Sequence, residues 1–201
     1  IKYFRNSKLD MYISVTGKDV LEEIKSKKKK VIFISGHFNN FELMALQIEK
    51  SGIDLATIYR PLNNIFLNKT MENIRKKYIC KKQIKKGKAG TREIIEYIKK
   101  GSSIALMIDQ RVSEGIQSIF FKRKAFTTTI PAHLIKKYDL EVVPVYIKRE
   151  EGIFFKLFFE KPILFNKTKT TYEITEDLNR ILERMILKNP TQWIWSHNRW
   201  K

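Results

Sequence analysis

The chain has 201 residues, of which 43% are hydrophobic and 12% aromatic, a composition that is typical of a globular protein and excludes a disordered one. Its 40 lysine and arginine residues stand against 21 acidic residues and give a formal net charge of +19, which indicates a polyanionic neighbour such as nucleic acid, an anionic membrane, phosphorylated lipid or an acidic protein. Cys80 is the only cysteine, so neither a disulfide within the chain nor a thiolate metal site can form, and we expect a reducing compartment.

The start of the chain indicates a truncated sequence. It begins at Ile1 rather than Met and opens on the polar text RNSKLD. No stretch approaches the ~18 consecutive apolar residues of a membrane span, and no secretory signal pattern is present. The length fits one substantial core, so we expect residues 1–201 to form a single domain.

From residue 31 onward, short apolar runs alternate with helical patterns. The runs are rich in β-branched residues and predict buried strands. In chain order the predicted elements are a strand at 31–35, a helix at 40–50, a strand at 55–59, helices at 64–78 and 91–100, a strand at 104–108, a helix at 131–138 and a strand at 142–147. This alternation is typical of an α/β fold with a mostly parallel sheet flanked by helices.

The last third of the chain predicts one more strand and one more helix. Residues 153–165 (IFFKLFFEKPILF) predict a strand that Pro162 ends, with an antiparallel course as one option, which would make the sheet mixed. Residues 172–188 predict an amphipathic helix that Asn189-Pro190 ends. Its apolar face consists of Ile174, Leu178, Ile181, Leu182 and Met185.

The positive charge is concentrated in residues 75–100. Eleven lysine and arginine residues stand there against two glutamates, which leaves a net charge of +9. Two explanations are open, because such a stretch is either a solvated face of a lysine-rich protein or a docking surface for a polyanion.

A histidine lies at the predicted turn between the first strand and the first helix, in the text VIFISGHFNNFELMALQIEK. Gly36 permits a tight bend there. Positions five apart on a straight helix differ by ~140°, so His37 and Glu42 meet only if His37 lies in the turn. Glu42 would then accept a hydrogen bond from one ring nitrogen and leave the other free as a general base.

No protein nucleophile accompanies this histidine. Ser35 lacks the Gly-x-Ser-x-Gly context of a nucleophile elbow, so the base would act on a hydroxyl group of the substrate. Two structural explanations stay open at this point. Asn39-x-x-Glu42 fits a capping box, and a lone histidine beside an apolar strand is often a core residue.

Seven segments together carry a resemblance to a known family. They are GHFNNFE at 36–42, YRPLNN at 59–64, Arg75, DQR at 109–111, FFKRKAFTTT at 120–129, VVPVY at 142–146 and QWIWSHNRWK at 192–201. HFNNFE fits the H-x4-D/E pattern of glycerolipid-type acyltransferases. The ordered set is similar to the bacterial lipid A secondary acyltransferases, of the lauroyl and myristoyl transferase type, over residues 31–201. H-x4-E alone is a weak motif, whereas the ordered set is highly specific.

The resemblance implies a glycerol-3-phosphate acyltransferase-like fold, with His37 as general base and Glu42 as its partner. The substrate-binding residues that it implies are Arg75, Asp109, Arg60 and Gln110. An arginine can stabilise the oxyanion of a tetrahedral intermediate or bind a lipid phosphate. Asp109 follows an apolar strand, where ligand sites form in open α/β sheets. A solvated Arg75 and a helix-capping Asp109 are the structural alternatives.

The implied function is transfer of a fatty acyl chain from acyl carrier protein to a hydroxyl of a lipid A precursor, in lipopolysaccharide lipid A biosynthesis. The implied location is the cytoplasmic face of the cell inner membrane, with peripheral attachment or a single-span anchor. No metal or cofactor is expected, because the thiolate of a thioester is already a good leaving group. The expected partners are the carrier protein, a phosphorylated glycolipid and an anionic membrane, and not nucleic acid. Acyl transfer to another glycolipid, such as a phosphatidylinositol mannoside, or from acyl-CoA is the nearest alternative, and a basic nucleic-acid-binding protein is a remote one.

The sequence departs from the family pattern in a few places. Lysines and a tyrosine follow Arg75 where the family usually has a glycine, and the tail reads HNRW at 197–200 instead of HRRW. We expect residues 1–201 to be the single acyltransferase domain and the family's N-terminal membrane anchor to be missing from this chain. His133 and His197, the other histidines, are expected to be structural.

Overall fold

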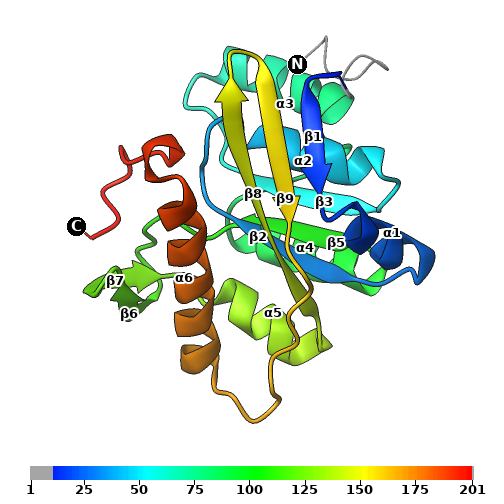
Figure 1. The fold of residues 1–201 in the computed structure, drawn as a ribbon. Coiled ribbons are helices and arrows are strands. Elements are labelled where there is room, and N and C mark those ends of the chain that lie inside the picture. The colour runs from blue at the N-terminus through cyan, green and yellow to red at the C-terminus, as the bar shows by residue number, and fades with distance from the viewer. Residues whose placement is uncertain (1–10, 201) are drawn as a thin grey trace.

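The protein is built around a seven-stranded sheet with helices on both sides (Figure 1). The structure is a computed structural model and describes residues 11–200 apart from the side chain of Lys88. The elements are β1 (Ile13–Thr16), α1 (Lys18–Ser26), β2 (Val31–Ser35), α2 (Glu42–Lys50), β3 (Leu55–Tyr59), α3 (Ile65–Tyr78), β4 (Lys82–Lys85), α4 (Lys88–Lys99), β5 (Ser103–Met107), β6 (Ile116–Phe120), β7 (Arg123–Thr127), α5 (Ile130–Tyr138), β8 (Glu141–Glu151), β9 (Phe154–Phe159), α6 (Thr171–Lys188) and a 3-10 helix at Pro190–Gln192.

Each strand that the sequence predicts is a strand in the structure, and each predicted helix is a helix. β2 and β3 have the predicted bounds, and the helices differ from prediction only at their ends. β8 is longer than expected, because it continues to Glu151 and pairs with β9 in a hairpin. β9 is antiparallel to β8 and ends at Phe159, ahead of Pro162.

The sequence patterns do not indicate β1, α1, β4, β6 or β7. β4 reads KQIK and buries only Ile84 fully, so it lacks the apolar run that reveals a strand. β6 and β7 form a separate antiparallel pair that packs against α6. Its turn carries left-handed φ angles at Phe121 and Lys122, which no glycine or proline marks in the sequence.

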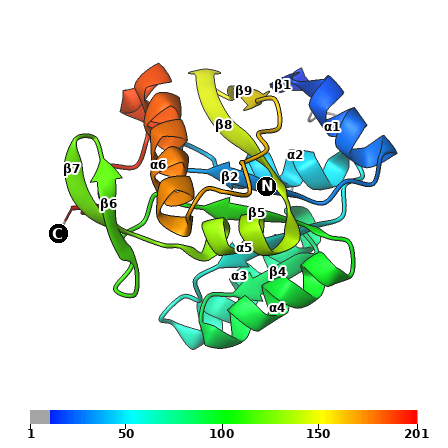
Figure 2. The ribbon, with the colours of Figure 1, turned by 90° about the horizontal axis from the view of Figure 1, so that it is seen from below.

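The sheet has the strand order β1-β9-β8-β2-β5-β3-β4. β8, β2, β5, β3 and β4 are parallel, which confirms the mostly parallel sheet, and β1 and β9 run the other way. β2 is buried along its whole length. Figure 2 shows why the central strands are covered on both faces, since α2 and α4 lie on opposite sides of β5. Because β2, β5 and β3 are parallel neighbours, their carboxyl ends meet at one edge of the sheet. Open α/β sheets bind ligands at that edge.

The C-terminal segment returns to that edge. α6 begins with a capping box in which Thr170 and Glu173 bond reciprocally. Its buried face includes Leu178, Leu182 and Met185 and packs against β6, α5 and β8. The helix ends at Lys188, and residues 190–200 then run along the sheet edge that holds the carboxyl end of β2.

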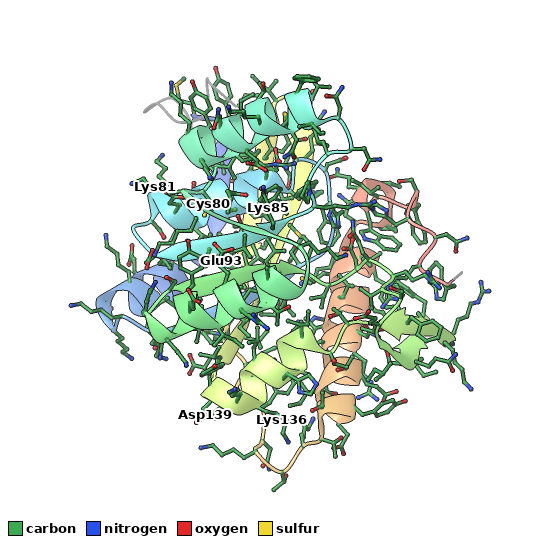
Figure 3. All side chains as sticks on the ribbon, turned by 180° about the vertical axis from the view of Figure 1, so that it is seen from behind. Cys80, Lys81, Lys85, Glu93, Lys136 and Asp139 are labelled. Carbon is green, nitrogen blue, oxygen red and sulfur yellow. The ribbon has the colours of Figure 1, made fainter. Side chains whose placement is uncertain are left out.

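The basic stretch at 75–100 covers the last turn of α3, the edge strand β4 and helix α4. Figure 3 labels Lys81 and Lys85 on this face, near Cys80. Lysines on an edge strand oppose pairing with another chain. One of them also has a local partner, because Lys85 Nζ lies 3.5 Å from a carboxylate oxygen of Glu72.

Candidate active site

Two neighbouring parallel strands bring His37 and Asp109 together. Ser35 of β2 pairs with Met107 of β5, and each candidate residue follows two positions later. His37 Nδ1 lies 2.7 Å from Asp109 Oδ1, and the backbone N–H of His37 donates to Asp109 Oδ2 at 2.6 Å. Backbone and ring are therefore held by the same carboxylate, which fixes both the position and the rotation of the imidazole.

The Asp109 carboxylate is buried, with 1% of its surface exposed, and it has a third donor. Trp193 Nε1 donates to Oδ2 at 2.8 Å. Burial raises the pKa of the Asp109 carboxyl, but the hydrogen bonds and charge interaction with His37 and the bond from Trp193 outweigh burial, so the pKa lies below its usual value. A charged Asp109 accepts a hydrogen bond from Nδ1–H, which leaves His37 Nε2 as the unprotonated nitrogen.

Gly36 makes this arrangement possible through close approach. A Cβ at this position would lie 2.9 Å from Leu182 Cδ1, 3.2 Å from Asp109 Oδ2 and 3.4 Å from Trp193 Nε1. The left-handed bend of the turn falls instead at Asn40, which has a φ of 54°. Any side chain at position 36 would thus push apart the groups that hold the histidine.

Glu42 lies elsewhere than the sequence predicts. Its Oε1 accepts a hydrogen bond from Arg75 Nε at 3.0 Å, and Asp109 occupies the position beside His37 that the spacing suggested for Glu42. The capping box with Asn39 does not form, because α2 begins at Glu42 with Phe41 at its N-cap and no side-chain cap. The physical reason is direction: as the first residue of α2, Glu42 faces α3, while the turn aims His37 toward β5.

Arg75 is held at two places. Besides the bond to Glu42, its guanidinium carbon lies 5.8 Å from the centroid of the Tyr59 ring. The Arg75 side chain is 19% exposed and that of Glu42 27%, so the pair lies partly in solvent and its guanidinium can reach an anion. Phe41, the residue before Glu42, packs its ring edge-on against His37 at 4.9 Å between centroids.

Gln110 and His197 complete the surroundings of the base. Gln110 Nε2 lies 3.3 Å from His197 Nε2, and the His197 ring packs edge-on against His37 with 5.4 Å between centroids. In the sequence, only the tail motif QWIWSHNRWK could have placed His197 here. Arg60 follows the last residue of β3 and is exposed. His133 lies exposed on α5, whereas His197 is half-buried.

The tail at 190–200 forms one wall of the site. Asn39 N–H donates to Gln192 O at 3.0 Å, and Ile194 N–H donates to His37 O at 2.9 Å, so the tail pairs with the histidine turn as a short antiparallel bridge. Trp193 was a residue that sequence reasoning did not assign to the site. The tail motif QWIWSHNRWK was the signal that could have identified it.

A buried arginine anchors this tail. Arg199 is fully buried and donates to Phe126 O at 2.5 Å and to Thr127 Oγ1 at 2.6 Å. Burial lowers the pKa of Arg199 to about 10, with the negative charge of Asp109 acting in the opposite direction. The guanidinium therefore stays charged at neutral pH and ties the tail to β7.

Two surface cavities lie away from the candidate residues. The cavities, of about 630 and 330 Å³, are lined mainly by the 163–169 loop with α6, and by α1 with β9; neither lining includes a candidate residue. Within residues 11–200, no group of three or more His, Cys, Asp or Glu side chains lies so as to hold a metal ion. Over the same part of the chain, no helix is long and apolar enough to cross a membrane.

Comparison with known proteins identifies the family. The model of the family described as bacterial lipid A biosynthesis acyltransferase matches residues 1–201. The chain is 22% identical over 209 residues to a lipid A biosynthesis lauroyltransferase of Escherichia coli K12. It is also 22% identical over 203 residues to a lipid A biosynthesis palmitoleoyltransferase of the same strain and to a lipid A biosynthesis acyltransferase of Shigella flexneri. These matches cover 99% of this chain but 65% of each relative, so the chain spans just under two thirds of their length.

A solved structure shares the fold. The crystal structure of the 1-acyl-sn-glycerophosphate acyltransferase PlsC from Thermotoga maritima superposes with a TM-score of 0.55 at 17% sequence identity. The match covers 90% of this chain and 73% of that one. The expected glycerol-3-phosphate acyltransferase-like fold is thereby confirmed.

Proposed function

The chain belongs to the bacterial lipid A biosynthesis acyltransferase family, and from this premise we propose that it transfers a fatty acyl chain from acyl carrier protein to a hydroxyl group of a lipid A precursor. The observation that carries the proposal is the contact between His37 and the buried, charged Asp109. It supplies a base with its orienting carboxylate at the sheet edge where ligands bind. The nearby Ser35 hydroxyl is buried and donates to Gly36 O and Met44 Sδ rather than to His37.

In the proposed reaction, His37 Nε2 takes the proton of the acceptor hydroxyl as its oxygen attacks the thioester carbon. The carbon–sulfur bond of the tetrahedral intermediate then breaks, and the leaving phosphopantetheine thiolate recovers the proton from the imidazolium. Asp109 stabilises the imidazolium without taking its proton, because its own pKa lies below the usual value. It thereby takes the role that the motif spacing suggested for Glu42.

Glu42 acts in this proposal through Arg75. The hydrogen bond from Arg75 Nε to Glu42 at 3.0 Å fixes the guanidinium, whose charge then stabilises an oxyanion or binds a phosphate of the acceptor. Gln110 and Arg60 lie at the same edge of the sheet and remain proposed substrate-binding residues. Neither role calls for a metal or a cofactor, because the thioester is already activated.

The charge of the chain supports the proposed partners. A net charge of +19 suits an acidic carrier protein, a phosphorylated glycolipid and the anionic cytoplasmic leaflet of the inner membrane. We propose that residues 1–201 form one acyltransferase domain that works at that surface.

The test of the base uses two histidines in one protein. His37→Ala should abolish acyl transfer from carrier-protein thioester to lipid A precursor, read as product mass, while circular dichroism stays unchanged. His133→Ala is the matched control, because this exposed histidine lies on α5 and should leave the rate as in the parent. Acyl transfer that persists in His37→Ala would refute the role of His37 as the general base.

The donor and acceptor are tested separately from the base. Carrier-protein thioester and acyl-CoA are offered in parallel, each with a lipid A precursor and with a mannosylated phosphoinositide. Turnover of acyl-CoA alone would contradict the carrier-protein assignment. Acylation of the phosphoinositide alone would contradict the lipid A assignment, in either case without affecting the role of His37.

A further inference from the structure

Helix α3 begins with an unusual group of exposed apolar side chains. Ile65 is 81% and Phe66 88% exposed, and Leu62 and Leu67 next to them are exposed as well. No residue of α3 is fully buried. We call these four residues the α3 cluster. Several large apolar side chains together on a surface are typical of a site that contacts a protein or a membrane.

The α3 cluster is held in place rather than loose. The Asn64 side chain accepts hydrogen bonds from the backbone N–H groups of Phe66 and Leu67 and so caps the helix. Asn68 Oδ1 accepts from Leu62 N–H at 2.9 Å, which ties the preceding loop to the same helix. The exposure of these side chains is therefore a fixed feature of the fold.

A second apolar group lies at the tip of the β8–β9 hairpin. It consists of Met11, Ile153 and Phe154, all of them exposed, and we call it the hairpin cluster. The ring of Phe154 packs on Tyr12 with 5.7 Å between centroids, which fixes the tip against the start of β1. Figure 1 shows this tip and α3 at the same end of the molecule.

The two clusters stand on either side of the catalytic edge. In the strand order, β2 and β5, which carry His37 and Asp109 at their carboxyl ends, lie between β8 and β3. The α3 cluster follows the carboxyl end of β3. β8 is parallel to β2, and its last residue paired with β2 is Pro144. It continues for residues 145–151, a further ~23 Å at ~3.3 Å per residue.

The charges beside the α3 cluster favour an anionic partner. Arg60 and Lys69 are exposed next to it, and Lys76 is exposed in the last turn of the same helix. The one acidic residue of α3, Glu72, is engaged by Tyr59, Asn68 and Lys85. A helix that presents bulky apolar side chains together with lysines is typical of an element lying in a membrane interface.

We propose that the α3 cluster and the hairpin cluster dock this protein on an anionic phospholipid bilayer, with the His37–Asp109 edge facing the lipid. The α3 cluster enters the interface on one side of the site and the hairpin tip on the other. A lipid acceptor could then present its headgroup hydroxyl to His37 while its acyl chains stay in the bilayer. This orientation rests on the proposed function, whereas the docking itself does not.

The test is co-sedimentation of the 201-residue chain with vesicles of phosphatidylcholine, with and without phosphatidylglycerol. Ile65→Ser/Phe66→Ser should weaken binding to anionic vesicles by about tenfold or more, since two large side chains lose their burial in lipid. Phe154→Ser should weaken it less. Lys69→Gln/Lys76→Gln should reduce the preference for anionic vesicles, by about fivefold per lysine.

Leu164→Ser is the matched control. Leu164 is 64% exposed, and its neighbour Ile163 pairs with Val142 at the start of β8, the opposite edge of the sheet. This variant should bind vesicles as the parent does. All variants should keep the parent circular dichroism, because every substituted side chain is exposed. All except Phe154→Ser, which loses the ring contact with Tyr12, should also keep the parent melting temperature.

Two results would overturn the docking surface. One is equal vesicle binding by the parent and Ile65→Ser/Phe66→Ser, and the other is an equal loss in Leu164→Ser. If Ile65→Ser/Phe66→Ser instead turned a dimer into a monomer in sedimentation velocity with vesicle binding intact, the surface would be an interface between copies. His37→Ala separates the docking proposal from the proposed acyl transfer, because this variant should lose acyl transfer but bind vesicles like the parent. If the parent bound vesicles but showed no acyl transfer, only the proposed function would be contradicted.

Discussion

Replacement of Asp109 by asparagine tests which carboxylate orients the base. The aspartate accepts from His37 N–H, His37 Nδ1 and Trp193 Nε1 at 2.6, 2.7 and 2.8 Å. Asparagine has almost the same shape but only one acceptor oxygen. If that oxygen keeps the bonds from the His37 backbone and Trp193, the amide NH₂ faces Nδ1. Nδ1 must then accept, and the proton moves to Nε2, which no longer acts as a base.

The expected loss follows from this change of tautomer. In a hydrolase triad the same substitution lowers kcat by ~10⁴-fold, so we expect a loss of about 10³ to 10⁴ in Asp109→Asn, or ~4 to 5.5 kcal/mol in the activation barrier. The free energy of unfolding should fall by only ~1–3 kcal/mol, because two of the three hydrogen bonds survive with a neutral acceptor.

Two measurements check the reasoning on Asp109→Asn. Acyl transfer at saturating donor and acceptor gives kcat, and ¹⁵N chemical shifts of labelled histidine report which nitrogen of His37 carries the proton. We expect Nδ1–H in the parent and Nε2–H in the variant. A variant that keeps Nδ1–H and works within about tenfold of the parent rate would refute the role of Asp109 as orienting group.

Three further predictions concern stability and reactivity. Gly36→Ala should lower the free energy of unfolding by ~1–3 kcal/mol in urea titrations, because its Cβ would lie 2.9 Å from Leu182 Cδ1; an unchanged midpoint would contradict the close approach. The pKa of Asp109 is lowered in the folded state, so its stabilisation is present above the unfolded value of ~3.9 and is lost as the pH falls through the folded value. The stability gap between the parent and Asp109→Asn should therefore narrow on acidification in urea titrations at a series of pH values. Burial, with the charge of Glu49, raises the pKa of the Cys80 thiol to about 12, so iodoacetamide should label Cys80 at neutral pH only after unfolding.

The sequence predicts most of the sheet because its central strands are buried on both faces. VIFIS at 31–35 and LATIY at 55–59 are continuous apolar runs, and the structure gives them the predicted bounds. The strand KQIK at the sheet edge and the hairpin at 116–127 could not be predicted in this way. Their side chains face solvent or a local partner, so they leave no run of apolar residues to detect.

The candidate site, too, was predictable only in part. The position of His37 after a buried strand and before a helix was readable in the sequence, as was the ordered set of motifs that led to the family. The tail could be matched as text, but its contact with the histidine turn depends on how α6 packs.

By itself, then, the sequence determined that the protein is an α/β acyltransferase-family chain with a candidate base at His37, because apolar runs and motif order are properties of the chain. Tertiary structure decided which carboxylate serves that base. Asp109 lies 72 positions from His37 and reaches it because β2 and β5 are adjacent parallel strands. Glu42, five positions away, opens a helix that turns its carboxylate toward Arg75. Spacing along a chain limits which residues can meet, whereas strand order and register select the pair that does.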